Sequence, residues 1–321
     1  MDQRQFIIDL RNYMNTRIIG QPDLVESLII ALLADGHLLV EGAPGLAKTR
    51  AIKELAEAVE GDFHRVQFTP DLLPADLTGT EIFRPQEGTF EFQKGPIFHN
   101  LILADEINRA PAKVQSALLE AMAEQQISVG SQTYALPDLF LVMATQNPIE
   151  QEGTYPLPEA QLDRFLMHVR VDYPDAEAEQ QILNLTRKEA HHTADAVAPD
   201  TELKQASLFE ARDAVLDIHM SPELERYLIE IVIATRNPAK YHADLERWIE
   251  YGASPRATMA LDRCARAHAW LADKDYVSPS DLQAVAHAVL RHRVLLSYEA
   301  EADGIDTDQV IDRLLELVAV P

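Results

Sequence analysis

A glycine-containing turn between an apolar run and a helix constrains this chain more than any other feature. The run at residues 37–41 is short and mostly apolar, as in a buried strand, and an amphipathic pattern begins near Lys48. Such a turn directs backbone N–H groups and a helix N-terminus toward phosphate oxygens. Lys48 adds an ammonium group, and the Thr49 hydroxyl is a ligand for Mg²⁺. The order of strand, turn and helix therefore predicts a site for the phosphates of a nucleotide.

The turn departs from the general phosphate-loop pattern at one position. Its residues are, in order, Gly42, Ala43, Pro44, Gly45, Leu46, Ala47, Lys48 and Thr49. Ala47 stands where the pattern has its second glycine. Because alanine still supplies a backbone N–H group, the predicted contact with phosphate is kept.

Five short apolar runs predict the strands of a parallel sheet. They cover residues 37–41, 66–69, 101–104, 140–144 and 165–171. The runs are continuous rather than alternating, which is typical of strands buried on both faces, and helical patterns lie between them. We therefore predict an α/β fold built on a five-stranded parallel sheet.

Two segments interrupt the alternation of strand and helix. Residues 77–94 are rich in Thr, Phe and Gly around a turn at 86–88, and residues 127–136 turn at 130–131. Turn residues flanked by strand-forming residues are typical of β-hairpins. We predict two hairpins inserted into the helical layer.

The pattern of the chain changes after residue 173. Beyond it, amphipathic helices follow one another without a strand pattern, and a polar stretch at 189–200 indicates a linker. A length of 321 residues is ordinary for two domains. We predict an α/β nucleotide-binding domain at 1–173 and a linker with a smaller all-helical domain at 174–321.

Polar side chains follow two of the predicted strands. Asp105 and Glu106 come directly after the run at 101–104, where the first would bind the metal and the second would polarise an attacking water. Asn147 follows the run at 140–144 and would orient the same water, because ligands bind beyond the carboxyl ends of parallel strands. Each has a structural alternative: a solvated acidic loop for the carboxylates and an Asn-Pro turn for the amide.

Several arginines have open roles at this stage. Arg164, just before the fifth strand, is either a salt-bridge residue or a charge that reaches the γ-phosphate of a neighbouring subunit. Arg256, at the start of a helix, reaches the nucleotide from the second domain or lies exposed at the surface. For Arg291 and Arg293, near a predicted helix end, interaction with the helix dipole is favoured over contact with a phosphate or a neighbour.

The charge of the chain disfavours nucleic acid as a partner. Lys and Arg total 28 against 52 Asp and Glu, a net charge of −24, and the excess is even, with 13 basic and 25 acidic residues up to Asp172. A protein that binds a phosphate backbone broadly carries a basic face or domain. Neither half of this chain is basic.

Cysteine content and hydropathy indicate a cytoplasmic protein. Cys264 is the sole cysteine, which excludes an intrachain disulfide and a cysteine-based zinc site. The longest apolar run, at 28–40, is interrupted by Asp35 and is too short to span a membrane. The first ten residues lack the apolar core of a secretory signal.

Taken together, the motifs resemble those of the MoxR group of AAA+ ATPases, over residues 18–296. They are Ile19-Gly20-Gln21, the loop at 42–49, Asp105-Glu106-Ile107-Asn108-Arg109-Ala110-Pro111, Thr145-Gln146-Asn147-Pro148, Leu162-Asp163-Arg164-Phe165 and Ser254-Pro255-Arg256. Alanine at the position of Ala47 is usual in that group. The resemblance implies a P-loop NTPase core of the AAA+ type, followed by a helical lid.

The resemblance also implies roles at the phosphate end of the site. Lys48 and Thr49 would bind phosphate and Mg²⁺, as parts of the loop that holds ATP. Asp105 and Glu106 would form the Walker B pair, in which Asp105 helps to hold the metal and Glu106 activates water.

Further roles follow from the remaining motifs. Asn147 would be sensor 1, Arg164 the arginine finger that acts on the adjacent protomer, and Arg256 sensor 2. Ile19 and Gly20 would pack near adenine. The two hairpins would match those of the AAA+ branch that includes magnesium-chelatase ATPase subunits and MCM helicases.

The implied function is ATP-driven, chaperone-like remodelling of partner proteins. Members of the group are thought to form hexameric rings and to work with proteins that contain von Willebrand factor A domains. Metal insertion, as by magnesium-chelatase subunits, is the first alternative, and a scaffold that binds nucleotide without turnover is another. An MCM-like nucleic-acid motor is disfavoured, because residues 77–94 carry two basic against three acidic side chains and residues 127–136 carry no charge.

Overall fold

A five-stranded parallel sheet forms the centre of the computed structural model, which describes residues 3–86, 88–130, 132–148, 153–191 and 202–321. Its order is β2-β5-β8-β1-β9. The strands are β1 (Leu38–Gly42), β2 (Phe63–Gln67), β5 (Leu101–Asp105), β8 (Leu141–Gln146) and β9 (Met167–Val171). The prediction of a five-stranded parallel α/β sheet is confirmed.

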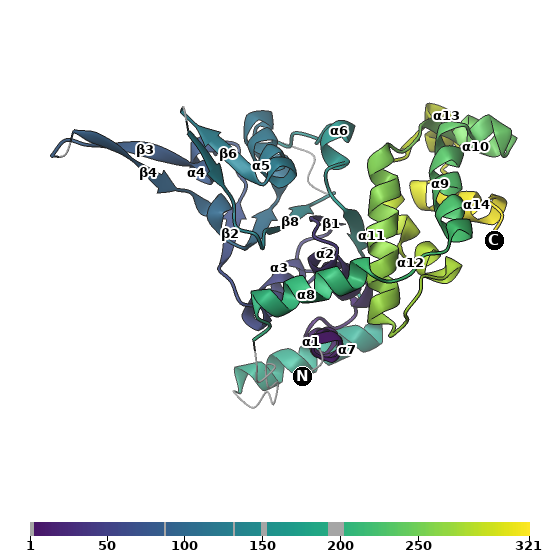
Figure 1. Ribbon diagram of the computed structural model, residues 1–321, viewed down its shortest axis with the longest axis horizontal. Helices are drawn as coiled ribbons and strands as arrows, with labels where there is room; N and C mark the ends of the chain where they lie inside the picture. The colour runs from purple at the N-terminus through teal and green to yellow at the C-terminus, as the bar shows by residue number, and fades with distance from the viewer. Residues whose placement is uncertain (1–2, 87, 131, 149–152, 192–201) are drawn as a thin grey trace.

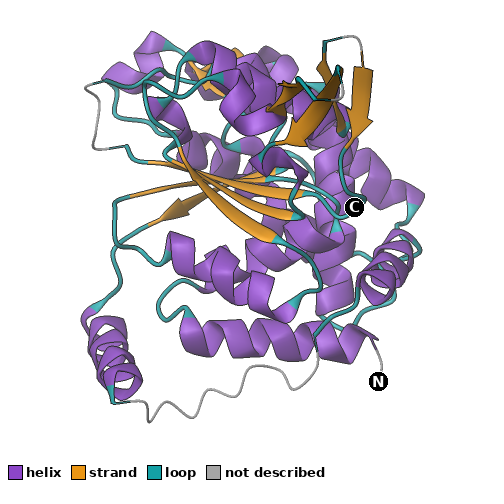
Figure 2. Ribbon diagram, turned by 90° about the vertical axis from the view of Figure 1, so that its left-hand side faces the viewer, coloured by secondary structure: helices purple, strands orange, loops and turns teal. Residues whose placement is uncertain are grey.

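Helices cover both faces of this sheet, as Figure 2 shows edge-on. Leu38 and Val40 of β1 belong to one apolar core, with α1 (Gln3–Arg17), α2 (Pro22–Leu33) and α3 (Lys48–Ala58). Leu39, between them, belongs to a second core, with α5 (Ala112–Glu124). Successive side chains of a strand point to opposite faces, so a continuous apolar run is buried on both sides.

Two antiparallel hairpins extend from the sheet domain. α4 (Pro74–Thr78) leads into β3 (Gly79–Arg84) and β4 (Thr89–Lys94), which project from the body in Figure 1. The second pairs β6 (Gln126–Val129) with β7 (Gln132–Ala135). Phe92 and Tyr134 stack with ring centroids 4.1 Å apart, so the two hairpins support one another. Positions 87 and 131, within the two predicted turns, lie outside the described residues.

The C-terminal part is a helical lid. Its longer helices are α8 (Gln205–Leu216), α9 (Pro222–Arg236), α11 (Pro255–Leu271), α12 (Pro279–Leu290) and α14 (Thr307–Leu317). The short elements are α10 (Ala243–Trp248), β10 (Ile249–Tyr251), β11 (Leu295–Leu296) and α13 (Tyr298–Ala302). β10 and β11 pair antiparallel, an addition to the all-helical expectation, because strands of two or three residues are too short to give a sequence pattern.

Helix α7 (Ala176–Ala190) corrects the predicted linker. The helix includes Glu189, which pairs with Arg17 and Arg50, so the polar stretch begins inside a helix held by ion pairs. Residues 192–200 of that predicted linker lie outside the described residues. α7 meets the C-terminal end of α1 through the Arg17–Glu189 pair, and Figure 1 shows both helices at the lower edge of the sheet domain.

Parallel pairing of the strands determines where the residues predicted to bind phosphate lie. Val40 of β1 lies opposite Thr145 of β8, and Ala104 of β5 lies opposite Ala144. The carboxyl ends of β1, β5 and β8 therefore meet at one edge of the sheet.

His37, just before β1, makes folding sensitive to acid. Its ring is buried, its Nδ1 accepts from the Val142 N–H group at 3.1 Å, and its Nε2 lies 3.2 Å from the Met122 carbonyl oxygen. Burial lowers the pKa of His37 from 6.5 to about 4. Below pH 6.5 the unfolded chain takes up a proton that the native ring does not, so stability falls toward pH 4.

We expect His37→Asn to lose part of this pH dependence. From the two pKa values, 6.5 and about 4, the ring accounts for a fall of about 2 kcal/mol in unfolding free energy between pH 7 and pH 5. The check is urea unfolding at pH 7 and pH 5, with the exposed His191→Gln as the matched control. The same slope in His37→Asn as in the wild type would contradict the account.

Candidate nucleotide-binding site

The loop after β1 forms an open cradle in front of α3. A side chain at Gly42 would place its Cβ 2.5 Å from the Val171 carbonyl oxygen, so glycine is required where β1 passes β9. Gly45 has φ of +85°, and a Cβ at this position would meet no atom within 4 Å, which leaves its backbone accessible from the front. Ala47 caps α3 with φ of +58°, the conformation that explains why a glycine is common at this position.

Lys48 and Thr49 begin α3 directly behind this cradle. The Lys48 Nζ donates to the Gly42 carbonyl oxygen at 2.6 Å. Burial lowers the pKa of Lys48, and the nearby carboxylates of Asp105, Glu106 and Glu41 oppose that shift. The residues predicted from the sequence at the phosphate end share one cavity of about 420 Å³, which is lined by Lys48, Thr49, Asp105, Glu106 and Asn147 among others.

Thr145 fixes the two carboxylates at the end of β5. Its buried hydroxyl donates to Asp105 Oδ1 at 2.6 Å and accepts from the Glu106 N–H group at 2.9 Å. Glu106 has φ of +57°, a left-handed conformation that is costly for a residue with a side chain.

Three residues that the sequence analysis did not select contact these carboxylates. Arg65, on β2, pairs with Asp105 Oδ2 at 2.6 Å, and Gln67 donates to Glu106 Oε2 at 2.9 Å. Arg109 lies 3.0 Å from the same Glu106 oxygen. Arg65 and Gln67 are two residues apart and so lie on one face of β2, which could have indicated them from the sequence. The strand was predicted at 66–69, however, which leaves Arg65 outside it.

An apolar hollow of about 680 Å³ adjoins the cradle, and both share the residues of 44–47 and Arg50. Its outer wall includes Ile19, Tyr173, Ile182 and Leu183. Gly20 permits this arrangement, because a Cβ there would lie 3.0 Å from the Ala178 side chain of α7. The hollow is suited to a flat, apolar group joined to the phosphates, such as a nucleotide base.

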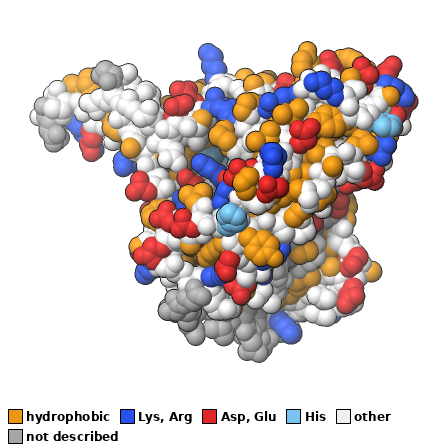
Figure 3. Space-filling view, turned by 45° about the vertical axis from the view of Figure 1, so that its right-hand side comes forward, with side chains coloured by type: hydrophobic (Ala, Val, Ile, Leu, Met, Phe, Trp, Pro, Cys, Tyr) orange, Lys and Arg blue, Asp and Glu red, His pale blue; other side chains and the backbone are white. Residues whose placement is uncertain are grey.

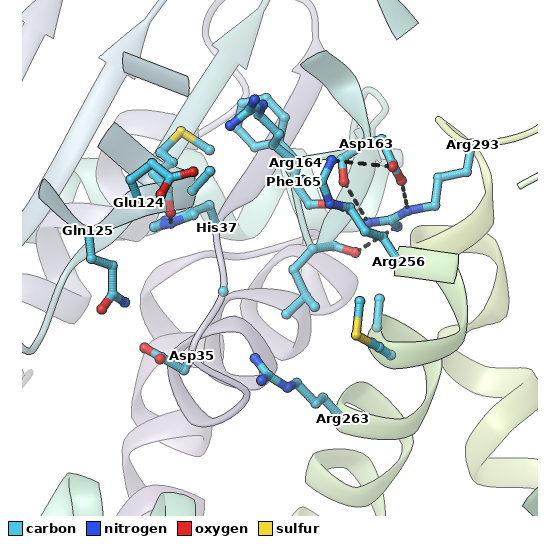
Figure 4. A pocket seen from close by; sticks show the side chains of 16 residues that line it. Asp35, His37, Glu124, Gln125, Asp163, Arg164, Phe165, Arg256, Arg263 and Arg293 are labelled. Carbon is cyan, nitrogen blue, oxygen red and sulfur yellow. Dashed lines mark hydrogen bonds and ion pairs between the residues drawn. The ribbon is translucent and has the colours of Figure 1, made fainter. Parts of the chain in front are cut away.

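Arg164 and Arg256 lie in a different pocket, between the sheet domain and the lid. This pocket of about 420 Å³ is also lined by Asp163, Arg263 and Arg293 (Figure 4). Arg164 donates to the Leu119 carbonyl oxygen at 3.1 Å, and Arg256 lies 3.6 Å from Asp163. Neither arginine lines the cavity that holds Lys48 and Glu106. Within one chain, the structure therefore separates the predicted arginines from the predicted phosphate site.

Comparisons with known proteins agree with this geometry. Residues 37–167 match the family model described as the ATPase family associated with various cellular activities (AAA), and residues 243–314 match the AAA lid domain. The chain is 46% identical over 308 residues to a Mycobacterium tuberculosis protein named Chaperone MoxR1, across 95% of this chain and 79% of the relative.

The chain belongs to the MoxR family of AAA+ ATPases. Protein MoxR of Paracoccus denitrificans is 35% identical, across 98% of this chain and 96% of the relative. A crystal structure of a candidate ATPase from Cytophaga hutchinsonii superposes with a TM-score of 0.90 at 45% identity, covering 99% of this chain and 96% of that chain. The MoxR resemblance and the fold of an AAA+ core with a helical lid are thus confirmed.

The donor set at the sheet edge fits magnesium carried by a nucleotide. Among the described residues, no group of three or more His, Cys, Asp or Glu side chains could hold a metal ion by itself. Mg²⁺ is typically held by one or two protein oxygens together with phosphate oxygens and waters. The Thr49 hydroxyl and the Asp105 carboxylate, on one cavity with the open cradle, provide such oxygens.

The sequence predicts that the chain does not span a membrane, and the lengths and polarity of the helices test this. In the part of the chain that the structure describes, each helix is too short or too polar to cross a bilayer.

Leu183→Asn tests whether the hollow receives the base. Leu183 is partly exposed on α7 and lines the hollow, so ATP would cover it. Loss of part of its apolar contact would weaken ATP binding about tenfold, and binding of tripolyphosphate, which has no base, would be unchanged.

Calorimetric titration of both ligands provides the measurement. Leu216→Asn, at an exposed leucine on α8, is the matched control and retains wild-type affinity for both. An equal loss of ATP and tripolyphosphate affinity in Leu183→Asn would rule out a base at this position.

Proposed function

We propose that the chain hydrolyses ATP at a site completed by a second copy, and uses the cycle for chaperone-like remodelling of partner proteins. The proposal rests on one observation: the residues at the phosphate end and the two arginines lie in different cavities. Lys48, Asp105 and Glu106 share one cavity, whereas Arg164 and Arg256 face another. A protomer thus has the residues for binding ATP but needs arginines from a neighbour for rapid turnover.

Each residue at the phosphate end has a role that follows from its position. The N–H groups of the loop at 42–49 and the Lys48 ammonium bind the phosphates, for which Lys48 exchanges the Gly42 carbonyl oxygen for a phosphate oxygen. Thr49 and Asp105 would hold Mg²⁺, which when bound would neutralise charge on the phosphate oxygens.

Glu106 takes the proton of the attacking water. Its carboxylate accepts from the Gln67 amide and the Arg109 guanidinium, and both contacts restrain the side chain. Asn147, at the end of β8, lines the same cavity and orients that water. The Gln67 amide and the Arg109 guanidinium are therefore well placed to set the direction of Glu106.

Arg164 acts on the adjacent protomer as an arginine finger, and Arg256 acts beside it. An arginine finger contributes about 10³ to 10⁵ in turnover in phosphoryl-transfer enzymes. An isolated protomer is then a poor ATPase, and assembly switches activity on. A closed ring supplies every site with a neighbour, and a hexamer is the assembly we propose.

Partner proteins, rather than nucleic acid, are the proposed clients. The M. tuberculosis relative carries the name Chaperone MoxR1, which favours remodelling of proteins over metal insertion. On the face in Figure 3, acidic and basic side chains are interspersed. The net charge of −24 disfavours nucleic acid as a client. We propose proteins with von Willebrand factor A domains as partners, in the cytoplasm.

Glu106→Gln is expected to bind ATP with wild-type affinity and to lose about 99% of turnover or more, because an amide cannot accept the proton of water. Glu120→Gln, at an exposed position on α5, is the matched control and retains wild-type turnover. Phosphate release and nucleotide calorimetry provide the measurements. Wild-type turnover in Glu106→Gln would remove Glu106 from the role of base.

Arg164→Ala tests the shared site by mixing. This variant alone is expected to lose about 10³-fold or more in turnover and to keep ATP affinity. When it is mixed with inactive Glu106→Gln, activity reappears, because the second protomer presents an intact Arg164 to the intact Glu106 of the first. Arg226→Ala, an exposed arginine on α9, serves as the control and stays active alone. Two inactive variants that remain inactive when mixed would contradict a finger acting between protomers.

A further inference from the structure

A buried ion pair connects the Arg164 segment to the lid. Asp163 directly precedes Arg164, and Arg293 follows α12. The Arg293 Nε lies 2.8 Å from Asp163 Oδ1, and the two side chains are 2% and 15% exposed. Exclusion of water at this pair strengthens its attraction and raises the cost of breaking it.

Arg293 also binds the backbone on both sides of the segment. Its Nη1 donates to the Leu166 carbonyl oxygen at 3.0 Å, and its Nη2 donates to that of Phe165 at 2.5 Å. A further bond joins Arg293 to the Val289 carbonyl oxygen of α12. The planar guanidinium thus fixes the chain from Asp163 to the start of β9 against the end of α12.

The other oxygen of Asp163 connects to the helix that carries Arg256. Asp163 Oδ2 accepts from the Ser254 hydroxyl at 2.7 Å and lies 3.6 Å from Arg256 Nη1. Ser254 is the N-cap of α11, and its hydroxyl oxygen accepts from the Arg256 N–H group at 3.1 Å. A single carboxylate therefore contacts Arg293 through one oxygen and the start of α11 through the other (Figure 4).

We propose that Asp163 and Arg293 are positioning residues that hold Arg164 and Arg256 as one unit facing the nucleotide of the neighbouring protomer. The proposal rests on the arginine finger of the proposed function and extends it to residues that touch no nucleotide. Arg164 belongs to the sheet domain and Arg256 to the lid, and the Asp163 carboxylate joins their two segments directly. Misplacement of a positioned group by about 1 Å costs up to about 100-fold in rate.

The Asp163–Arg293 pair could instead serve only to stabilise the fold of its own protomer, and we call this role clamping. Loss of a clamping pair damages the protomer in which it occurs, including that protomer's own phosphate site. Loss of positioning damages only the site of the neighbour that receives Arg164 and Arg256. The two are therefore distinguished by which protomer of a mixed assembly loses activity.

The experiment compares Asp163→Asn, Arg293→Lys and a control. Asp163→Asn removes the charge that orients both arginine segments, and Arg293→Lys keeps a cation beside Asp163 but removes the bonds to Phe165 and Leu166. We expect each to lower kcat about 10- to 100-fold with the affinity of the protomer for ATP unchanged. In Arg293→Lys a positive charge remains beside Asp163, so this variant tests the proposal even if Asp163→Asn does not fold.

Asp308→Asn is the matched control. Asp308, on α14, pairs with Arg291 at 2.7 Å and so also binds the end of α12. It contacts neither Arg164 nor Arg256 in the described structure, and kcat is expected to remain within about twofold of the wild type.

Mixing with Glu106→Gln decides between positioning and clamping. The Glu106→Gln protomers supply well-placed arginines, so activity of Asp163→Asn or Arg293→Lys sites rises several-fold on mixing. Wild-type kcat in both variants, or low activity that mixing does not restore, overturns the proposal. The proposed function is tested separately, by mixing Arg164→Ala with Glu106→Gln. If activity recovers in that mixture while Asp163→Asn has wild-type kcat, the arginine finger stands and only the positioning role is rejected.

Discussion

Parallel hydrogen bonding between β1, β5 and β8 brings segments far apart in the sequence to one edge of the sheet. The register places Val40 opposite Thr145 and Ala104 opposite Ala144. As a result, the loop that begins at Gly42, the Asp105-Glu106 pair and Asn147 follow neighbouring strands. A slip of one residue between β5 and β8 would turn the Thr145 hydroxyl away from both Asp105 and the Glu106 backbone. The chemistry proposed for this protein depends on that register.

The residues at this edge of the sheet make up only part of the proposed ATPase site. Lys48 contacts a carbonyl oxygen of its own loop, Asp105 pairs with Arg65, and Glu106 contacts Gln67 and Arg109. These contacts satisfy charges that are partly removed from water, and phosphate and Mg²⁺ would replace several of them. The Asp163–Arg293 pair is one of the contacts that join the lid to this domain, and it lies next to the arginines proposed to act on the neighbouring site.

Much of this architecture was predictable from the sequence, and the reasons are local. The five strands gave continuous apolar runs, and the phosphate loop lies between one of those runs and a helix, as its chemistry requires. β2 was placed about three residues late, because this edge strand is half exposed and its Arg65 and Gln67 are polar. α14 was not singled out from the sequence, although Val310, Ile311 and Leu314 are buried on one side of it.

The contacts between distant segments could not be predicted in this way. Arg293 was assigned to a helix end, whereas the structure places it against Asp163, 130 residues away in the chain. Nothing in its local sequence indicates that partner, because the pairing depends on how the lid packs on the sheet domain. For the same reason, the sequence left open whether Arg256 reaches the nucleotide from the second domain or lies exposed at the surface.

A structure of the assembled protein with Mg²⁺ and a slowly hydrolysed ATP analogue tests the central claim most directly. The account predicts the triphosphate between Lys48 and Glu106 of one protomer, with Arg164 of the adjoining protomer within hydrogen-bond distance of the γ-phosphate. A nucleotide bound away from this sheet edge, or a γ-phosphate that no neighbouring arginine reaches, would contradict it.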